Sequence, residues 1–171
     1  GTAETITNGN IKITGDANTT TVTVKQNESV TEYSKAAVAE VKATQTVTFK
    51  ALEKGDTVTV NGLTFTASKD LTATEVAAAF ADLSTKDTQD NGGVTANGYY
   101  TDYFGKNGAN PDITGWTSAA ANGATVTFTA PAFGTTTGLV VTSTNFDGET
   151  TIDSSLPTAA TIVPGKAAVP A

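Results

Sequence analysis

The chain has 171 residues, a formal net charge of −7 and only 16% charged residues. Roughly one residue in five is threonine, all ten basic residues are lysine, and histidine, cysteine and methionine are absent. The acidic balance argues against nucleic-acid binding, which needs basic side chains to displace counterions from phosphates. Without cysteine and histidine the chain lacks disulfides, thiolate and imidazole metal ligands, and the commonest general base.

The length allows one sizeable domain with flanking segments. We expect an N-terminal β segment with a connector (1–44), a core module (45–146), and a C-terminal strand with a Pro/Ala-rich tail (147–171). No apolar run reaches about 18 residues, so we expect no membrane insertion. The chain begins at Gly1 without a methionine, so we expect a processed mature chain or a piece of a longer one.

The first segment carries two runs of alternating residues, 11–14 and 21–25, with Gly, Asp and Asn between them. This pattern predicts a β-hairpin with a four- to five-residue loop. Residues 27–44 begin polar and become rich in alanine and valine. Their periodicity leaves three alternatives open, namely a short helix, an edge strand or a connector.

The most regular stretch of the chain predicts a second hairpin. Asn61-Gly62 separates two alternating runs and supplies the pair of positive φ angles that a type I′ turn requires. In such a hairpin Val60 faces Leu63 and Val58 faces Phe65, all on one apolar face. The other face is made of threonines: Thr57, Thr59, Thr64 and Thr66.

A helix is predicted directly after this hairpin, at about residues 73–83. Thr72 and Glu75 have the spacing of a capping box, and Val76, Phe80 and Leu83 follow at helical spacing. An apolar sheet face needs a cover, so we expect this helix to lie on the Val/Phe face of the hairpin.

Beyond a polar loop (84–98), aromatic residues gather within a stretch rich in Gly and Asn. Such a cluster is either a platform on which sugar rings stack, or part of the core at its open end. We name four of these residues as ligand-binding candidates: Tyr99, Tyr100, Tyr103 and Trp116.

Near the C-terminus, Asn122-Gly123 introduces another predicted hairpin, with 126–130 as one strand and 138–143 as the other. The motif V-T-F-x-A occurs at 47–51 and again at 126–130, so we expect these two strands to be neighbours or partners in one sheet. Residues 154–171 read as an extended linker or as a tail along a sheet edge.

Four stretches resemble a unit that recurs in very large Thr/Ala/Gly-rich proteins of the proteobacterial cell surface. They are ITGDANTTTVTVKQ (13–26), VTFKALEKGDTVTVNGLTFTA (47–67), ATEVAAAFADL (73–83) and GWTSAAANGATVTFTA (115–130). These proteins are surface-layer and adhesin-like and are associated with type I secretion. The resemblance implies an extracellular structural module and no catalytic residues. The Gly/Asp-rich calcium-binding nonapeptide of many such proteins is absent.

Calcium is the only cofactor that the composition favours, because hard oxygen ligands are present and soft ligands are not. Three groups of Asp, Asn and Glu are candidates, although none has EF-hand spacing and such residues commonly serve turns. The first contains Asp87, Asp90 and Asn91; the second, Asn107, Asn110 and Asp112; and the third, Asp147, Glu149 and Asp153.

Together these patterns predict a mostly β protein with one covering helix (α+β), with antiparallel sheets in a β-sandwich-like arrangement. We expect a non-enzymatic structural protein on the outside of a bacterial cell. It would assemble with copies of itself through sheet edges and terminal segments into a surface layer, sheath or fibre. The alternative is a carbohydrate- or surface-binding adhesin module that uses the aromatic loop 99–116 to bind a cell-surface glycan.

Overall fold

The computed structural model describes residues 36–101, 113–147 and 154–171. Residues 36–171 form one compact unit. Several predictions lie outside the described residues, namely the hairpin at 11–25, the aromatic candidate Tyr103, and the calcium-ligand candidates Asn107, Asn110, Asp112, Glu149 and Asp153.

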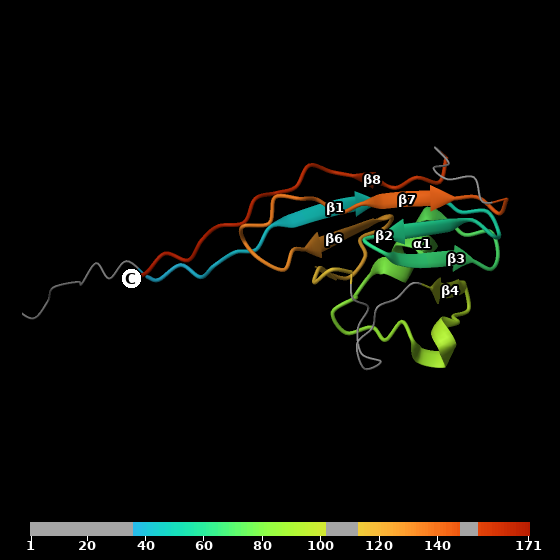
Figure 1. Cartoon of the computed structure of the whole chain (residues 1–171), viewed down its shortest axis with the longest axis horizontal. Helices are drawn as coiled ribbons and strands as arrows, with labels where there is room; N and C mark the ends of the chain where they lie inside the picture. The colour runs from blue at the N-terminus through green and yellow to red at the C-terminus, as the bar shows by residue number, and fades with distance from the viewer. Residues whose placement is uncertain (1–35, 102–112, 148–153) are drawn as a thin grey trace, which may run out of the picture. The chain divides into compact units, whose positions relative to one another are not determined.

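Two antiparallel four-stranded sheets and one α-helix make up the described fold (Figure 1). One sheet has the order β5-β6-β1-β8, with β1 (Thr44–Thr48), β5 (Thr117–Ser118), β6 (Thr125–Thr129) and β8 (Thr158–Ala159). The other has the order β4-β3-β2-β7, with β2 (Thr57–Val60), β3 (Leu63–Ala67), β4 (Gly98–Thr101) and β7 (Val141–Thr144). The fold is therefore mostly β with a single helix, as predicted.

The hairpin of β2 and β3 has the predicted register. Val60 pairs with Leu63 and Val58 with Phe65, and all four side chains are buried. Asn61 and Gly62 have φ angles of 45° and 92°, which are the two positive values of the predicted turn. This prediction is confirmed because the register follows from the turn and from the alternation beside it.

Helix α1 (Ala73–Phe80) begins with the predicted capping box. The Thr72 hydroxyl accepts from the Glu75 amide, and the Glu75 carboxylate accepts from the Thr72 amide. The predicted end at Leu83 is wrong, because Ala81 is extended and Asp82 has a φ of 56°. Leu83 is nevertheless buried, and its amide donates to the Ser118 hydroxyl of β5 at 2.9 Å.

The helix packs on the apolar face of the β2–β3 hairpin, as predicted. Phe80 is fully buried; its ring stacks on Phe49 with a centroid distance of 4.9 Å and meets Phe65 edge-on at 6.4 Å. The Ser118 hydroxyl donates to the Phe80 carbonyl at 2.6 Å, which ties the helix to the other sheet. Both sheets and the helix thus share one core. We call the group formed by Phe49, Phe65, Phe80 and Tyr100 the aromatic hub.

The two V-T-F-x-A strands are partners, which confirms that prediction. β1 and β6 pair antiparallel, with Val47 opposite Val126 and Thr46 opposite Thr127. The predicted hairpin between 126–130 and 138–143 is wrong, because β7 pairs with β2 in the other sheet. Strand β6 has β1 on one side and β5 on the other, so no side of it is left for β7. The Asn122-Gly123 turn instead joins β5 to β6.

Candidate functional site

Residues 36–44 and 163–169 form a two-stranded antiparallel ribbon, which we call the ribbon. It is held by three reciprocal pairs of backbone hydrogen bonds. Val38 pairs with Val169 at 2.9 Å in both directions, and Val41 with Lys166 at 2.8 and 2.6 Å. Thr44 pairs with Val163 at 3.0 and 2.7 Å, next to the sheets. The described part of this segment, 36–44, is therefore not a helix; it pairs through isolated bridges before β1 begins at Thr44.

The pairs of the ribbon recur every third residue on both segments. An antiparallel β ladder places its reciprocal pairs every second residue, whereas a repeat of three is that of the polyproline II helix. Pro164 and Pro170 fit this conformation because proline fixes φ near the required value. Pro164 lies between the pairing positions 163 and 166, and Pro170 lies beyond the last pairing position at 169, so their missing N–H groups cost no bond of the ribbon.

The ribbon runs away from the sheets, and in Figure 1 its two segments lie side by side at the blue and red ends of the described unit. Its valines are substantially exposed: Val38 by 49%, Val41 by 50% and Val163 by 59%. A two-stranded ribbon without a covering layer is marginally stable in water. Backbone hydrogen bonds therefore join the two segments of the ribbon, while its valine side chains stay about half exposed.

A buried glutamine anchors the second segment of the ribbon where it meets the sheets. Gln45 is 7% exposed and faces inward from β1. Its side-chain amide donates to the Ala160 carbonyl at 2.9 Å, and its side-chain oxygen accepts from the Leu139 amide at 2.7 Å. A buried amide with both ends bonded is stabilising and directional. Gln45 thus fixes the position of residue 160, 115 positions away in sequence.

A glycine lets the same segment approach the body closely. A methyl group added at Gly165 would lie 2.5 Å from the Val41 carbonyl oxygen and 2.6 Å from the backbone of Phe133. Backbone atoms cannot yield as the end of a flexible side chain can, so only glycine fits at this position. Residues 41, 45 and 133 therefore form a shaped acceptor for residues 160–165.

The outward faces of the two sheets are almost purely threonine. Among the described strands, Tyr99 is the single exception at an outward position, and none of the strands contains a charged residue. The outward threonines are Thr44, Thr46, Thr48, Thr117, Thr125, Thr127, Thr129 and Thr158 on one sheet and Thr57, Thr59, Thr64, Thr66, Thr101, Thr142 and Thr144 on the other. The edge strands of a sheet are commonly protected from association by lysine or proline. The edge strands described here, β4, β5, β7 and β8, contain neither residue.

The aromatic candidates occupy two different environments. Tyr100 is 4% exposed and donates its hydroxyl to the Ala79 carbonyl at 2.6 Å, and burial raises its pKa to about 12. Trp116 is also buried. Tyr99 points outward and is 40% exposed. It lines an open groove of about 800 Å³ together with Phe146, which is 80% exposed.

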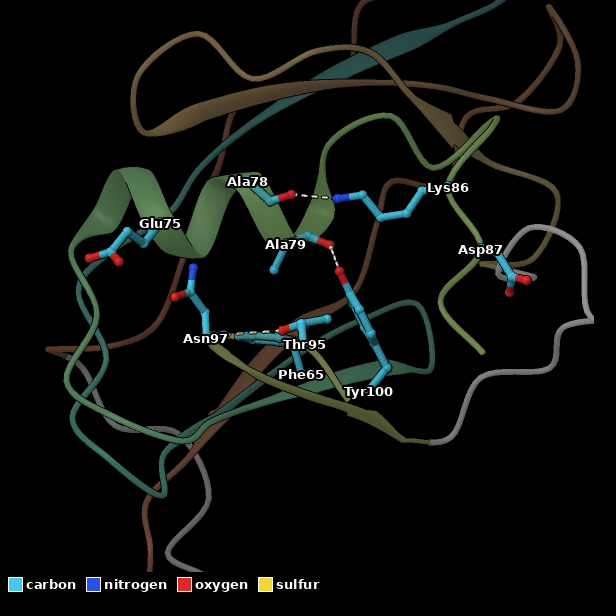
Figure 2. Close-up of a pocket in the computed structure, with 9 residues that line it drawn as sticks. All are labelled: Phe65, Glu75, Ala78, Ala79, Lys86, Asp87, Thr95, Asn97 and Tyr100. Carbon is cyan, nitrogen blue, oxygen red and sulfur yellow. Dashed lines mark hydrogen bonds between the residues drawn. The ribbon is translucent and has the colours of Figure 1, made fainter. Parts of the chain in front are cut away.

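Figure 2 shows a smaller cavity of about 210 Å³ beside the end of α1. Its polar groups are used by the fold. Lys86 donates to the Ala78 carbonyl at 2.6 Å, and Tyr100 donates to that of Ala79. Burial lowers the pKa of Lys86, although the nearby Asp82 opposes this shift. An ammonium group at the carbonyl end of a helix stabilises the helix dipole, so Lys86 stabilises the end of α1.

The acidic candidates show no metal geometry in the part of the chain that the structure describes. No group of three or more Asp or Glu side chains in those residues is placed to hold an ion. The Asp87 carboxylate accepts from the Gln89 amide at 2.9 Å, and Asp90 begins a short 3-10 helix, η1 (Asp90–Gly93). Asp147 is exposed, and its predicted partner Asp153 lies outside the described residues. Calcium binding stays a prediction.

Three residues of these sites were missed by the sequence analysis. Gln45 alternates with the inward-facing Ala43 and Val47, and an amide at an inward position was a readable sign of a buried polar contact. Gly165 follows Pro164, which by itself reads as an ordinary turn. Phe146 precedes an Asp-Gly turn and has no pattern that singles it out.

Comparisons with family models, curated proteins and solved structures found no match for this chain. Within the described residues, no helix combines the length and apolar character needed to cross a membrane.

Proposed function

We propose that the chain is a non-enzymatic structural protein of the bacterial cell surface. It assembles with copies of itself into a surface layer, sheath or fibre. The observation that carries the proposal is the ribbon. Backbone hydrogen bonds hold its second segment on the first, and the valine side chains of both segments stay about half exposed. The resemblance to repetitive cell-surface proteins supports the same function and the extracellular location.

The uncharged strands supply a second argument for association. A neighbouring copy that approaches a threonine face or an edge of the described strands buries no unpaired charge from them, and burying an unpaired charge is costly. Threonine pairs across strands already bond within one copy, as between Thr59 and Thr64, whose hydroxyl oxygens are 2.7 Å apart. A β-sandwich-like stacking of the sheets would present these faces on both sides of the module.

The test is the behaviour of the full chain in solution and on electron-microscopy grids. We expect ordered polymers at high protein concentration that persist in 1 M NaCl. The Debye length falls to about 3 Å at that salt concentration, so the repulsion between copies with a net charge of −7 is screened while uncharged contacts remain. Removal of residues 160–171 should abolish the polymers and leave the circular dichroism spectrum nearly unchanged. A full chain that stays monomeric at every concentration and salt would overturn the proposal.

A chelator separates two forms of the same proposal. If the polymers dissolve in EDTA and return with CaCl₂, calcium bridges copies; if they persist, the contacts are made by the chain alone. The described residues provide no ready-made ion site, so we expect persistence.

The groove on the second sheet favours one alternative function, which is the binding of a neutral cell-surface glycan. Its walls are the exposed rings of Tyr99 and Phe146, and hydroxyl groups of Thr57, Thr66 and Ser68 also line it. Aromatic rings match the apolar face of a hexose, and hydroxyls orient its polar edge. Lys54 is the one charged residue among the lining residues described, which argues for an uncharged sugar.

An array of neutral hexose oligosaccharides tests this alternative. Binding that is lost in Tyr99→Ala and in Phe146→Ala, but kept in Phe133→Ala, would establish the groove as a glycan site. Phe133 is the matched control because it is a similarly exposed ring, at 42%, that does not line the groove. Binding that survives both groove substitutions would exclude the groove.

A further inference from the structure

The ribbon also identifies the segment through which copies join. We propose that residues 160–171 of one copy leave their own first strand and occupy the acceptor of a neighbouring copy, which is formed by residues 36–46 and the backbone at 133. This inference rests on the proposed function and names the contact that would carry it.

The acceptor fits this segment and is built entirely from other parts of the chain. Ala160 bonds to the Gln45 side chain and to the Thr46 carbonyl, both at 2.9 Å, and Val163 pairs with Thr44. Gly165 fills the space between Val41 and Phe133. Because a second copy carries the same segment, the acceptor accommodates it with every one of these contacts retained. No other class of ligand has this built-in match.

The chain before residue 160 stays attached to its own body during such an exchange. Ser155 and Pro157 are buried, and the Ser155 hydroxyl lies 3.5 Å from the Asp56 carboxylate. The hinge is therefore at residues 158–159, because these two residues form β8 and make only a short pairing with β1. Exchange at such a hinge is a low-cost route to association.

The donated segment and the acceptor are different parts of one copy, so the contact between copies is heterologous. When each copy donates its segment to the next, such a contact repeats from copy to copy and gives a chain of molecules.

The absence of cysteine makes a clean cross-linking test possible. Val38 and Val169 form a reciprocal pair, and such pairs have Cα atoms about 5.5 Å apart, within the range of a disulfide. Full-length Val38→Cys and Val169→Cys proteins are mixed under assembling conditions and oxidised with copper phenanthroline. We expect a covalent dimer containing one copy of each. Val94→Cys mixed with Val169→Cys is the control, because Val94 is exposed and lies outside the acceptor.

The double variant, with both cysteines in one chain, decides where the segment lies. Exchange predicts a ladder of covalent multimers on a non-reducing gel, whereas an unexchanged ribbon gives only internally bridged monomers. If polymers form but only bridged monomers appear, the exchange is wrong and the proposed assembly stands. If neither polymers nor intermolecular links form, both are wrong.

A glycine pair supplies an independent readout. Gly165→Ala places a methyl group against the backbone of the acceptor, and overpacking of this kind should lower the cross-linked yield about tenfold. Gly134→Ala is the matched control, since a Cβ there has no atom within 4 Å. Equal yields from the two variants would show that residue 165 does not dock in the acceptor.

Discussion

The aromatic hub and the ribbon are held together by different forces, although both join segments far apart in the sequence. In the hub, four rings are buried and packed against one another and against α1. In the ribbon, three reciprocal backbone pairs do most of the holding, and the side chains stay half exposed. The buried rings of the hub make contact only when one copy packs its own core. The backbone bonds of the ribbon can form equally well with the same segment of another copy.

The largest effect should come from emptying the hub. Phe80→Ala removes a fully buried ring that contacts Phe49 and Phe65, so we expect a loss of about 3–5 kcal/mol in the free energy of unfolding. Urea denaturation measures it. Phe146→Ala, at a ring that is 80% exposed, should change the same quantity by less than about 0.5 kcal/mol. Similar losses in the two variants would mean that the hub is not the centre of stability.

The Tyr100 hydroxyl should make the hub sensitive to alkali. An unfolded tyrosine has a pKa near 10, and burial raises the pKa of Tyr100 to about 12. The folded state favours the neutral form of the Tyr100 hydroxyl. Its contribution to the free energy of unfolding is therefore complete below pH 10 and is lost as the pH rises from 10 to 12. The free energy of unfolding should fall by about 3 kcal/mol over this range.

Urea denaturation of the wild type and of Tyr100→Phe across this pH range isolates the effect from lysine titration. The variant should begin about 1 kcal/mol less stable, because the Ala79 carbonyl loses its donor, and should show a smaller fall above pH 10. Tyr99→Phe removes a hydroxyl from an exposed ring and should follow the wild type. Parallel curves for the wild type and Tyr100→Phe would contradict the assignment.

An intermediate effect is expected where the ribbon meets the body. Gln45→Leu leaves the Ala160 carbonyl and the Leu139 amide without their side-chain partner, which should cost about 1–3 kcal/mol in the free energy of unfolding. Thr48→Val, at an exposed outward position of the same strand, should stay within about 0.5 kcal/mol of the wild type. If Gln45→Leu is neutral, the amide does not anchor residue 160.

The smallest effect should come from the ribbon itself. Val163→Thr keeps the shape of a side chain that is 59% exposed and leaves its backbone pair with Thr44 intact. We expect a change in unfolding free energy below about 0.5 kcal/mol. A loss above about 1 kcal/mol would show that the ribbon is part of the cooperative core, and that the ribbon and the aromatic hub do not differ in how they are held.

Local signals predicted the elements whose partners are close in sequence. The β2–β3 register followed from the Asn61-Gly62 turn, and the start of α1 followed from Thr72 and Glu75. The end of α1 was misplaced because it depends on Asp82, whose positive φ no periodicity reveals. The partner of β7 was misplaced because β6 is already paired on both sides, with the preceding strand β5 and with the distant strand β1.

Predictions about the candidate sites depended on which face each residue takes. The aromatic cluster was found, but the alternation along β4 sends Tyr100 inward and leaves Tyr99 outside. The sequence left the secondary structure of the first segment of the ribbon open. Its backbone pairs recur every third residue, a spacing that matches neither a β ladder nor an α-helix. Its partner segment also lies more than a hundred residues further along the chain.

The antiparallel ribbon also has a mechanical consequence. Residues 36 and 171 lie at its outer end, so a force that pulls them apart loads the Val38 and Val169 pair first and the Val41 and Lys166 pair only afterwards. Bonds that break one after another yield at lower tension than bonds that share a load. Strand β1, by contrast, is flanked by β6 on one side and β8 on the other. Under tension the pairs of the ribbon should therefore break first, before the sheets and the aromatic hub are loaded, and re-form when the tension falls.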